Sequence, residues 1–174
     1  MIYLEDLVAI CPHTRSGRLA LFVEPLNAAM KEFEIDQNVQ RETHFLAQVC
    51  HESGAFNYVA EIASGEAYEG RADLGNTEPG DGARFKGRGL IQITGRTNYA
   101  NCGAALGMDL LANPGLLEEP INAARSAGWF WNEHGLNALA DNGDARAITK
   151  RINGGLNGYQ DRLMYLDLAQ RRLT

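Results

Sequence analysis

The clearest pattern of apolar and polar positions lies in residues 38–53, NVQRETHFLAQVCHES. Its apolar residues recur at helical spacing and share one stripe of the predicted helix: Val39, Phe45, Leu46, Val49 and Cys50. Gly54 follows this run and suits the left-handed position at which many helices end. The pattern therefore predicts an amphipathic helix that ends close to Ser53.

Helical spacing recurs along most of the chain. Further helices are predicted at residues 18–33, 120–134, 145–152 and 160–172. We expect Pro25 to kink or split the first of these, Pro120 to lie in the first turn of the second, and Asp144 to cap the third. Trp129 and Trp131 belong to the second helix, where a place in the core and a place in a cleft wall both stay open.

Between residues 62 and 90 the helical pattern breaks. Seven glycines interrupt this segment: Gly65, Gly70, Gly75, Gly80, Gly82, Gly87 and Gly89. A long loop-rich segment inside a compact domain is usually functional or disordered. The next run, LIQIT at residues 90–94, alternates apolar and polar residues and predicts a short strand. The fold class expected is a mainly α domain with a Gly-rich loop and short-strand insert.

Length and charge narrow the function. The 174 residues contain no internal repeat and fit one domain spanning residues 1–174. A net charge of −6 and an isoelectric point near 5.2 argue against a broad nucleic-acid-binding surface. No run approaches the roughly 18–20 apolar residues that a membrane span needs. The first residues carry Glu5 and Asp6 and do not form a standard secretory signal, so export would need another route.

Cysteine and histidine usage gives no metal or disulfide framework. The three cysteines are widely spaced and form no CxxC pair, which favours reduced thiols. His44 and His51 lie two helical turns, about 10 Å, apart, too far to bind one metal ion easily. No HExxH motif occurs. A zinc amidase is therefore disfavoured, and neither a metal nor another cofactor is expected.

Glu52 has an unusual place on the predicted helix. At about 100° per residue it lies only about 20° from Phe45, at the edge of the buried stripe and beside Gln48. His51 falls on the opposite side. A carboxyl at a helix C-terminus meets the negative end of the helix dipole, and partial burial also disfavours its charge. These surroundings favour a general acid, whereas the ordinary alternative is a surface carboxylate paired with an arginine.

A second carboxylate, Glu61, follows nine residues later, after an aromatic segment. A base on a loop across a cleft from a helix-end acid fits inverting glycoside hydrolysis, in which the carboxyls stand about 6.5–9.5 Å apart. Glu66 and Glu69 lie close by and compete for this role. In an extended segment Gln92 and Thr94 share one face, as a groove that binds sugar hydroxyls and N-acetyl groups requires.

Three ordered segments resemble glycoside hydrolase family 19, in particular the phage and prophage endolysins related to the plant-type chitinases. They are FLAQVCHESG, GDGARFKGRGLIQITGRTNY, and RINGGLNG followed by DR. The N-terminal part, ICPHT…VEPLNAAMKEFEI, is also similar, so the resemblance covers nearly the whole chain. It implies a mainly α, lysozyme-like fold with two lobes around a central cleft. It also implies inverting hydrolysis of a β-1,4 bond in an N-acetylated polysaccharide.

The resemblance assigns the catalytic roles. The glutamate of the HES motif is the family's general acid and falls on Glu52. In the endolysin branch the general base falls on Glu61; in the plant enzymes it is placed farther on, which keeps Glu66 and Glu69 as lesser candidates. The Ser/Thr of the GRGxIQ motif, which helps to hold the attacking water, is Thr94 here and retains the hydroxyl.

Substrate binding is implied for five further residues. Gln92 belongs to the GRGxIQ motif, and the sugar-contacting positions correspond to Asn98, Tyr99 and Asn153. Arg162 matches an arginine that pairs near the base. A cation there would keep the carboxylate of the base ionised.

The expected function is that of an endolysin, which hydrolyses peptidoglycan glycan strands and so lyses the host cell. We expect a monomer without a separate wall-binding module, made in the host cytoplasm and released to the periplasm by a separate holin. Peptidoglycan is the expected partner, without nucleic acid or stable membrane insertion. A chitinase of the same family, a lytic transglycosylase that uses Glu52 alone, and a non-catalytic glycan-binding module are the alternatives.

Overall fold

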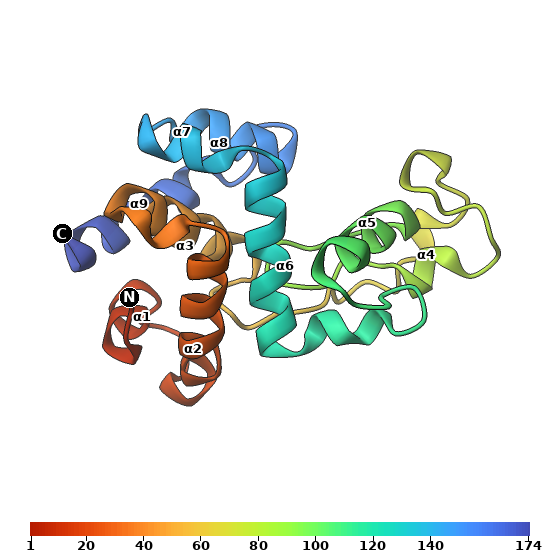
Figure 1. Ribbon diagram of the computed structural model, residues 1–174, viewed down its shortest axis with the longest axis horizontal. Helices are drawn as coiled ribbons and strands as arrows, with labels where there is room; N and C mark the ends of the chain where they lie inside the picture. Colours follow the sequence, from red (N-terminus) through yellow and green to blue (C-terminus); the bar gives the residue numbers. More distant parts are fainter.

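Helices make up most of the chain in the computed structural model, which describes residues 1–174 (Figure 1). The nine α-helices are α1 (Leu4–Ile10), α2 (Ser16–Glu32), α3 (Val39–Glu52), α4 (Asp81–Arg84), α5 (Arg96–Leu106), α6 (Pro120–Glu133), α7 (Leu136–Asp141), α8 (Ala145–Asn153) and α9 (Tyr159–Leu173). Four short 3₁₀-helices join them: η1 (Ile35–Gln37), η2 (Glu66–Tyr68), η3 (Ala72–Leu74) and η4 (Pro114–Glu118). None of the helices is long and apolar enough to cross a membrane.

The helices expected from apolar spacing are confirmed. Asn38 caps α3 by accepting a hydrogen bond from the Arg41 amide, and Asp144 caps α8 by accepting one from the Ala147 amide. Pro120 is the first residue of α6, where its missing N–H costs nothing. Pro25 does not split α2, which continues from Ser16 to Glu32.

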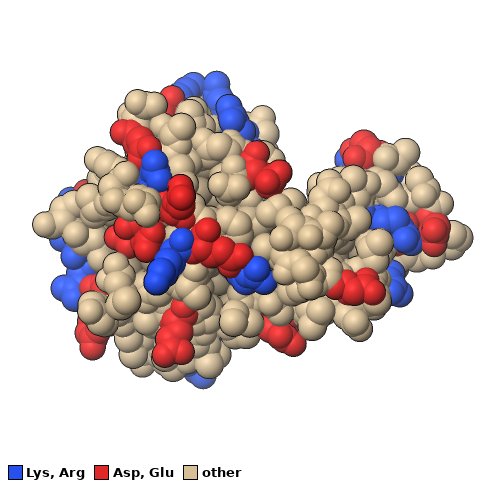
Figure 2. Space-filling model, in the orientation of Figure 1, with Lys and Arg blue, Asp and Glu red and all other residues tan.

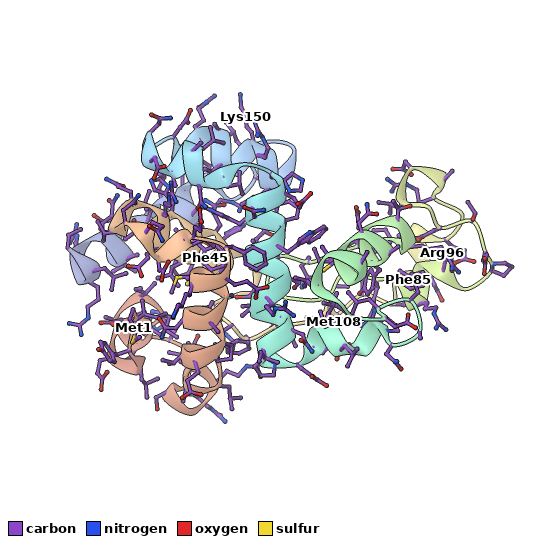
Figure 3. All side chains as sticks on the ribbon, viewed as in Figure 1. Met1, Phe45, Phe85, Arg96, Met108 and Lys150 are labelled. Atoms are coloured by element: carbon purple, nitrogen blue, oxygen red, sulfur yellow. The ribbon has the colours of Figure 1, made fainter.

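The molecule has two lobes, and each lobe is built around its own main apolar core (Figure 3). The larger core is built mainly from α1, α2, α3 and α6 and contains Phe45. The smaller core lies around α5 and contains Phe85. In Figure 1, α6 stands between the helices around α3 and the lobe that carries α4 and α5.

Helix α6 supplies one tryptophan to each core. Trp131 belongs to the larger core, where its ring meets Phe45 edge to face at 5.4 Å. Trp129 belongs to the smaller core. Residues two apart on a helix point about 200° apart, so the two rings leave α6 on opposite sides. The helix thereby ties the two lobes together.

The predicted strand at residues 90–94 is wrong. Arg88 and Ile93 exchange backbone hydrogen bonds of 3.1 and 2.8 Å, which closes the intervening residues into a tight loop. Gly89 and Gln92 both have positive φ, 86° and 25°, and turn the chain away from an extended path. The loop forms because Leu90, Ile91 and Ile93 are all buried, so the apolar residues do not alternate with exposed ones.

Polar side chains hold much of the Gly-rich segment in place. Asp81 is buried and forms two hydrogen bonds with Arg96, at 2.6 and 2.8 Å. The buried Asn76 links the Tyr68 carbonyl to the Arg96 amide. The carboxylate of Glu69 accepts hydrogen bonds from the backbone amides of Gly80 and Gly82. These contacts fix the insert against the smaller lobe.

Candidate active site

The C-terminus of α3 continues into a tight left-handed turn. Gly54, Ala55 and Phe56 have φ values of 55°, 55° and 67°. Ser53 stabilises the turn, since its hydroxyl donates to the Val49 carbonyl and accepts from the Phe56 amide. Left-handed conformations at residues other than glycine cost about 1–3 kcal/mol each and persist where the surroundings enforce them.

Neighbouring elements enforce this turn. The Thr14 hydroxyl donates to the Ala55 carbonyl and the Arg18 guanidinium donates to the Phe56 carbonyl, both at 2.8 Å. The Phe56 ring is fully buried and lies 5.3 Å from the Phe22 ring, measured between centroids. The turn therefore has a fixed geometry, and it carries the chain from the last helical residue of α3 to Glu61.

Glu52 is the last residue of α3 and is held by a cation from α9. The Arg162 guanidinium donates to Oε1 of Glu52 and to Oε1 of Gln48, at 2.5 Å in each case. Arg162 and Gln48 are buried, whereas the Glu52 side chain keeps 18% of its surface exposed. The Glu52 carboxylate makes no hydrogen bond other than the one from Arg162 to Oε1, so its Oε2 has no protein partner.

The expected place of Arg162 is therefore corrected. Its guanidinium lies beside Glu52 and not beside Glu61. The reason is the packing of α9 along α3, which brings Arg162 over the Gln48–Glu52 side of that helix. The expectation that Gln48 and Glu52 share one edge of α3 is confirmed, because one guanidinium reaches both.

Glu61 lies on an extended segment that pairs with the loop before Gln92. Its backbone amide donates to the Gly87 carbonyl at 2.9 Å, and the Lys86 ammonium donates to the Glu61 carbonyl at 3.1 Å. The Tyr68 hydroxyl donates to Oε2 of the Glu61 carboxylate at 2.9 Å. The other carboxylate oxygen, Oε1, is buried and has no hydrogen-bond partner.

Gly87 marks the point where three polar side chains converge. A Cβ atom at this glycine would lie 2.5 Å from Oε1 of Gln92, 2.9 Å from Oε2 of Glu61 and 3.2 Å from Oγ1 of Thr94. The structure therefore brings together three of the residues predicted to act on the substrate. Only a residue without a side chain leaves the space between them open.

Glu52 and Glu61 line one open pocket of about 380 Å³, together with Gln92, Tyr58 and Ile62. A second pocket of about 220 Å³ also includes Gln92 and adds further side chains: Thr94, Asn98, Trp129, Phe130 and His134. The shared Gln92 places the two pockets side by side. In Figure 2 the outline of the molecule is indented between the two lobes.

Tyr99 is not where a sugar contact requires it, whereas the sugar contact of Asn153 stays a prediction. Tyr99 is fully buried, and its hydroxyl donates to the Lys86 carbonyl and accepts from Arg88. Burial raises its pKa to about 12. Its expected contact with sugar is thus corrected to a structural role beneath the Lys86–Arg88 segment. Asn153 is exposed at the end of α8 and lines neither pocket.

The competing carboxylates are placed elsewhere. Glu66 is exposed at the start of η2 and lines neither pocket. Glu69 is occupied by the two amides of the α4 turn. The Nδ1–H of His51 donates a hydrogen bond to the Asp161 carboxylate at 2.6 Å, and the His51 ring packs against Gly158. Of the nearby candidates, Glu61 is the one that lines a pocket with Glu52.

Sequence reasoning missed the residues that support Glu61. Tyr68 and Lys86 lie in the Gly-rich segment, which has no periodicity from which their contacts with Glu61 could be inferred. Gly87, the first glycine of the GRG triplet, was the one available signal. A glycine whose φ is not positive often marks a place where other atoms approach the backbone closely, as they do here. No group of three or more His, Cys, Asp or Glu side chains lies in an arrangement that could hold a metal ion.

Comparison with known proteins matches this arrangement to one family. The model of the glycoside hydrolase family 19 domain, described as chitinase class I, matches residues 34–140. A family 19 domain-containing protein of Haemophilus influenzae is 32% identical over 163 residues, which cover 72% of this chain and 76% of that protein. An endochitinase of Arabidopsis thaliana is 41% identical over 111 residues, but this chain spans only 38% of its length.

Solved structures agree with the family match over almost the full chain. Chitinase C from Streptomyces griseus has a TM-score of 0.77 at 26% identity, over 99% of this chain and 76% of that one. A bacterial family 19 chitinase has a TM-score of 0.78 at 25% identity, over 97% of this chain and 93% of that one. The predicted mainly α, lysozyme-like fold is confirmed.

Proposed function

Because the chain belongs to glycoside hydrolase family 19, we propose that it hydrolyses β-1,4 bonds between N-acetylated sugars with inversion, using Glu52 as acid and Glu61 as base. One observation carries this proposal. Two carboxylates with different partners, Arg162 for Glu52 and Tyr68 for Glu61, line the same pocket. A pair of carboxyls that flanks the scissile bond is the requirement of glycoside hydrolysis.

Glu52 protonates the oxygen of the bond that breaks. Its Oε1 is held by Arg162, which leaves Oε2 as the oxygen that carries the proton toward the pocket. Glu52 takes up this proton from solvent water before the glycan fills the pocket. After the bond breaks, Glu52 is ionised and its contact with Arg162 stabilises the new charge.

Glu61 removes a proton from the attacking water. Its Oε1 has no protein partner and is the free acceptor. The Thr94 hydroxyl and Oε2 of the same carboxylate both lie close to Gly87, so Thr94 can hold the water beside this carboxylate, at the face of the sugar opposite the leaving group. Attack from that face inverts the configuration at the sugar carbon. Gln92, at the junction of the two pockets, and Asn98 provide amide groups for the N-acetyl and hydroxyl groups of the glycan.

The proposed substrate is the glycan strand of bacterial peptidoglycan. The support is the resemblance to phage endolysins, which extends into the N-terminal segment outside the matched residues 34–140. In this role the enzyme is made in the host cytoplasm, reaches the periplasm through a separate holin, and acts as a monomer. Chitin is the second candidate, because several relatives are named as endochitinases.

One set of product analyses tests the proposal. The purified chain is incubated with peptidoglycan sacculi and, separately, with a chitin oligosaccharide. We expect sacculi to release fragments with hydrated reducing ends in the α configuration, detected by mass spectrometry and proton NMR. Fragments with 1,6-anhydro ends would identify a lytic transglycosylase instead. Turnover of the chitin oligosaccharide alone would move the substrate assignment to chitin, and binding without turnover would leave a glycan-binding module.

A further inference from the structure

The loop that follows Glu61 folds back onto it. Gly65 has a φ of 87° and lies so close to α4 that a Cβ there would meet the Gly82 carbonyl at 2.5 Å. This close approach turns the chain and places η2 beside the segment that it has just left. Tyr68, the last residue of η2, thereby returns to Glu61, seven residues earlier in the chain.

The backbone of Tyr68 is fixed independently of the hydroxyl. The Asn76 amide donates to the Tyr68 carbonyl at 2.9 Å, and the Arg96 amide donates to Asn76 at 2.8 Å. Asn76 is fully buried, so these bonds are shielded from water. The hydroxyl of Tyr68 is therefore delivered to the Glu61 carboxylate by a rigid support.

The two oxygens of Glu61 have different surroundings. The Tyr68 hydroxyl occupies Oε2, whereas Oε1 is buried and unpartnered. A buried carboxylate oxygen without a partner is costly, and Glu61 lines a pocket together with Gln92, which indicates that a water or substrate group completes this oxygen. A single donor on one oxygen restricts rotation of the carboxylate about its last bond.

We propose that Tyr68 is a positioning residue for the general base: its hydroxyl holds Oε2 of Glu61 so that Oε1 faces the attacking water. This inference rests on the proposed function of Glu61. The phenol stays protonated while it does so, because burial and the neighbouring Glu61 raise its pKa. A hydrogen bond donated to a carboxylate also favours the ionised form, which is the form that a base requires.

Few other charged groups face this pair. The positive charge of Arg71, three residues beyond Tyr68, lowers the pKa of the Tyr68 phenol slightly against the effects that raise it. Arg71 is itself paired with Asp73. The Lys86 ammonium is directed to the backbone carbonyls of Glu61 and Ala63. Glu52 lines the same pocket. None of these groups replaces the donor that Tyr68 supplies to the carboxylate.

The test compares Tyr68→Phe with Tyr165→Phe. Tyr165 is a partly buried tyrosine of the larger lobe whose hydroxyl makes no hydrogen bond, so its variant controls for loss of a phenol oxygen. For Tyr68→Phe we expect kcat to fall about 10-fold to 100-fold, with KM within about 2-fold of wild type. The acidic limb of the plot of kcat against pH should move to higher pH, and the melting temperature should match that of Tyr165→Phe.

A purely structural role for Tyr68 predicts a different result. A fall in kcat that accompanies a lower melting temperature, with an unmoved acidic limb, would overturn the proposal. So would a kcat within about 2-fold of wild type. Where Tyr68→Phe does not fold, Tyr68→Met, which keeps a long apolar side chain and has no donor, supplies the same kinetic comparison.

A double-mutant comparison separates this inference from the proposed function. If Tyr68 acts through Glu61, adding Tyr68→Phe to Glu61→Gln should cause no further loss of the residual rate. A further loss of the same size as in the wild-type background would refute the inference and leave the function intact. Full activity in Glu61→Gln would instead refute the base assignment, and the inference with it.

Discussion

The guanidinium of Arg162 joins Glu52 and Gln48, two residues one helical turn apart on α3, to helix α9. The arginine is almost completely buried, at 1% side-chain exposure. The proposed acid is thus anchored by a residue 110 positions away in the chain. Its position depends on the packing of α9 against α3 as much as on α3 itself.

Arg162→Ala should destabilise the protein and impair hydrolysis together. Removing one partner of a buried ion pair costs about 3–5 kcal/mol. Here the loss leaves Gln48 without its partner and lets the Glu52 carboxylate rotate. Urea unfolding and the rate of glycan hydrolysis measure the two effects. Arg171→Ala, which removes an exposed pair with Asp167, is the matched control and should leave both quantities unchanged.

Glu52→Gln and Glu61→Gln should each abolish hydrolysis while the fold stays intact. An amide of the same shape can neither donate the proton nor accept one, and loss of a general acid or base costs about 10²–10⁴-fold in rate. Circular dichroism and release of reducing ends provide the two measurements. Glu66→Gln should keep the wild-type rate, since Glu66 is exposed outside the pocket. The base assignment is falsified if Glu61→Gln stays active while Glu66→Gln or Glu69→Gln does not.

Gly87→Ala should reduce hydrolysis more than it reduces stability. The added methyl group would occupy the point where Gln92, Glu61 and Thr94 converge, with contacts of 2.5–3.2 Å to their oxygens. The backbone of Gly87 itself tolerates alanine, because its φ is not positive. We expect a loss of about 10²-fold in kcat/KM, as small displacements of catalytic groups produce. Gly115→Ala adds the same methyl group where nothing lies within 4 Å and should be neutral.

The Asp81–Arg96 pair should make the smaller lobe sensitive to acid. The hydrogen bond from Arg96 lowers the pKa of Asp81, although burial opposes this effect. A lowered pKa in the folded state stabilises the protein above the unfolded value of about 3.9, and the contribution is lost as the pH falls through the folded value. Asp81→Asn should therefore cost about 2 kcal/mol at neutral pH. The difference from wild type should shrink below about pH 4.

Urea midpoints measured across this pH range test the prediction. Asp73→Asn provides the control, since Asp73 pairs with Arg71 at the surface, where ion pairs contribute little. A stability difference between wild type and Asp81→Asn that is constant with pH would show that the carboxylate charge is not the stabilising feature.

The helices could be predicted from the sequence because each one carries its own signal. The apolar stripe of α3, the Asp144 cap of α8 and the proline that begins α6 are all local features. The place of Glu52 at the edge of the stripe followed from the same geometry. These features do not depend on which other segment packs against them.

The contacts that complete the site could not be predicted in this way. Arg162 was expected beside Glu61, and no local pattern records that α9 packs along α3. Residues 90–94 predicted a strand because Ile91 and Ile93 alternate with Gln92 and Thr94, but this run is too short to separate a strand from a buried loop. The hydrogen bond between Tyr68 and Glu61 depends on a turn at Gly65, whose conformation arises from its close contact with α4.

The two tryptophans of α6 give the protein an intrinsic fluorescence signal from each lobe. Trp131 lies in the dry interior of the larger lobe, whereas Trp129 keeps 9% of its surface and borders the pocket that contains Gln92. Light emitted by the first ring reports the integrity of one lobe, and light emitted by the second responds to a sugar chain that displaces water beside it. Two variants that each retain one of the indoles would therefore allow glycan occupancy and the loosening of each lobe to be followed separately, without any attached dye.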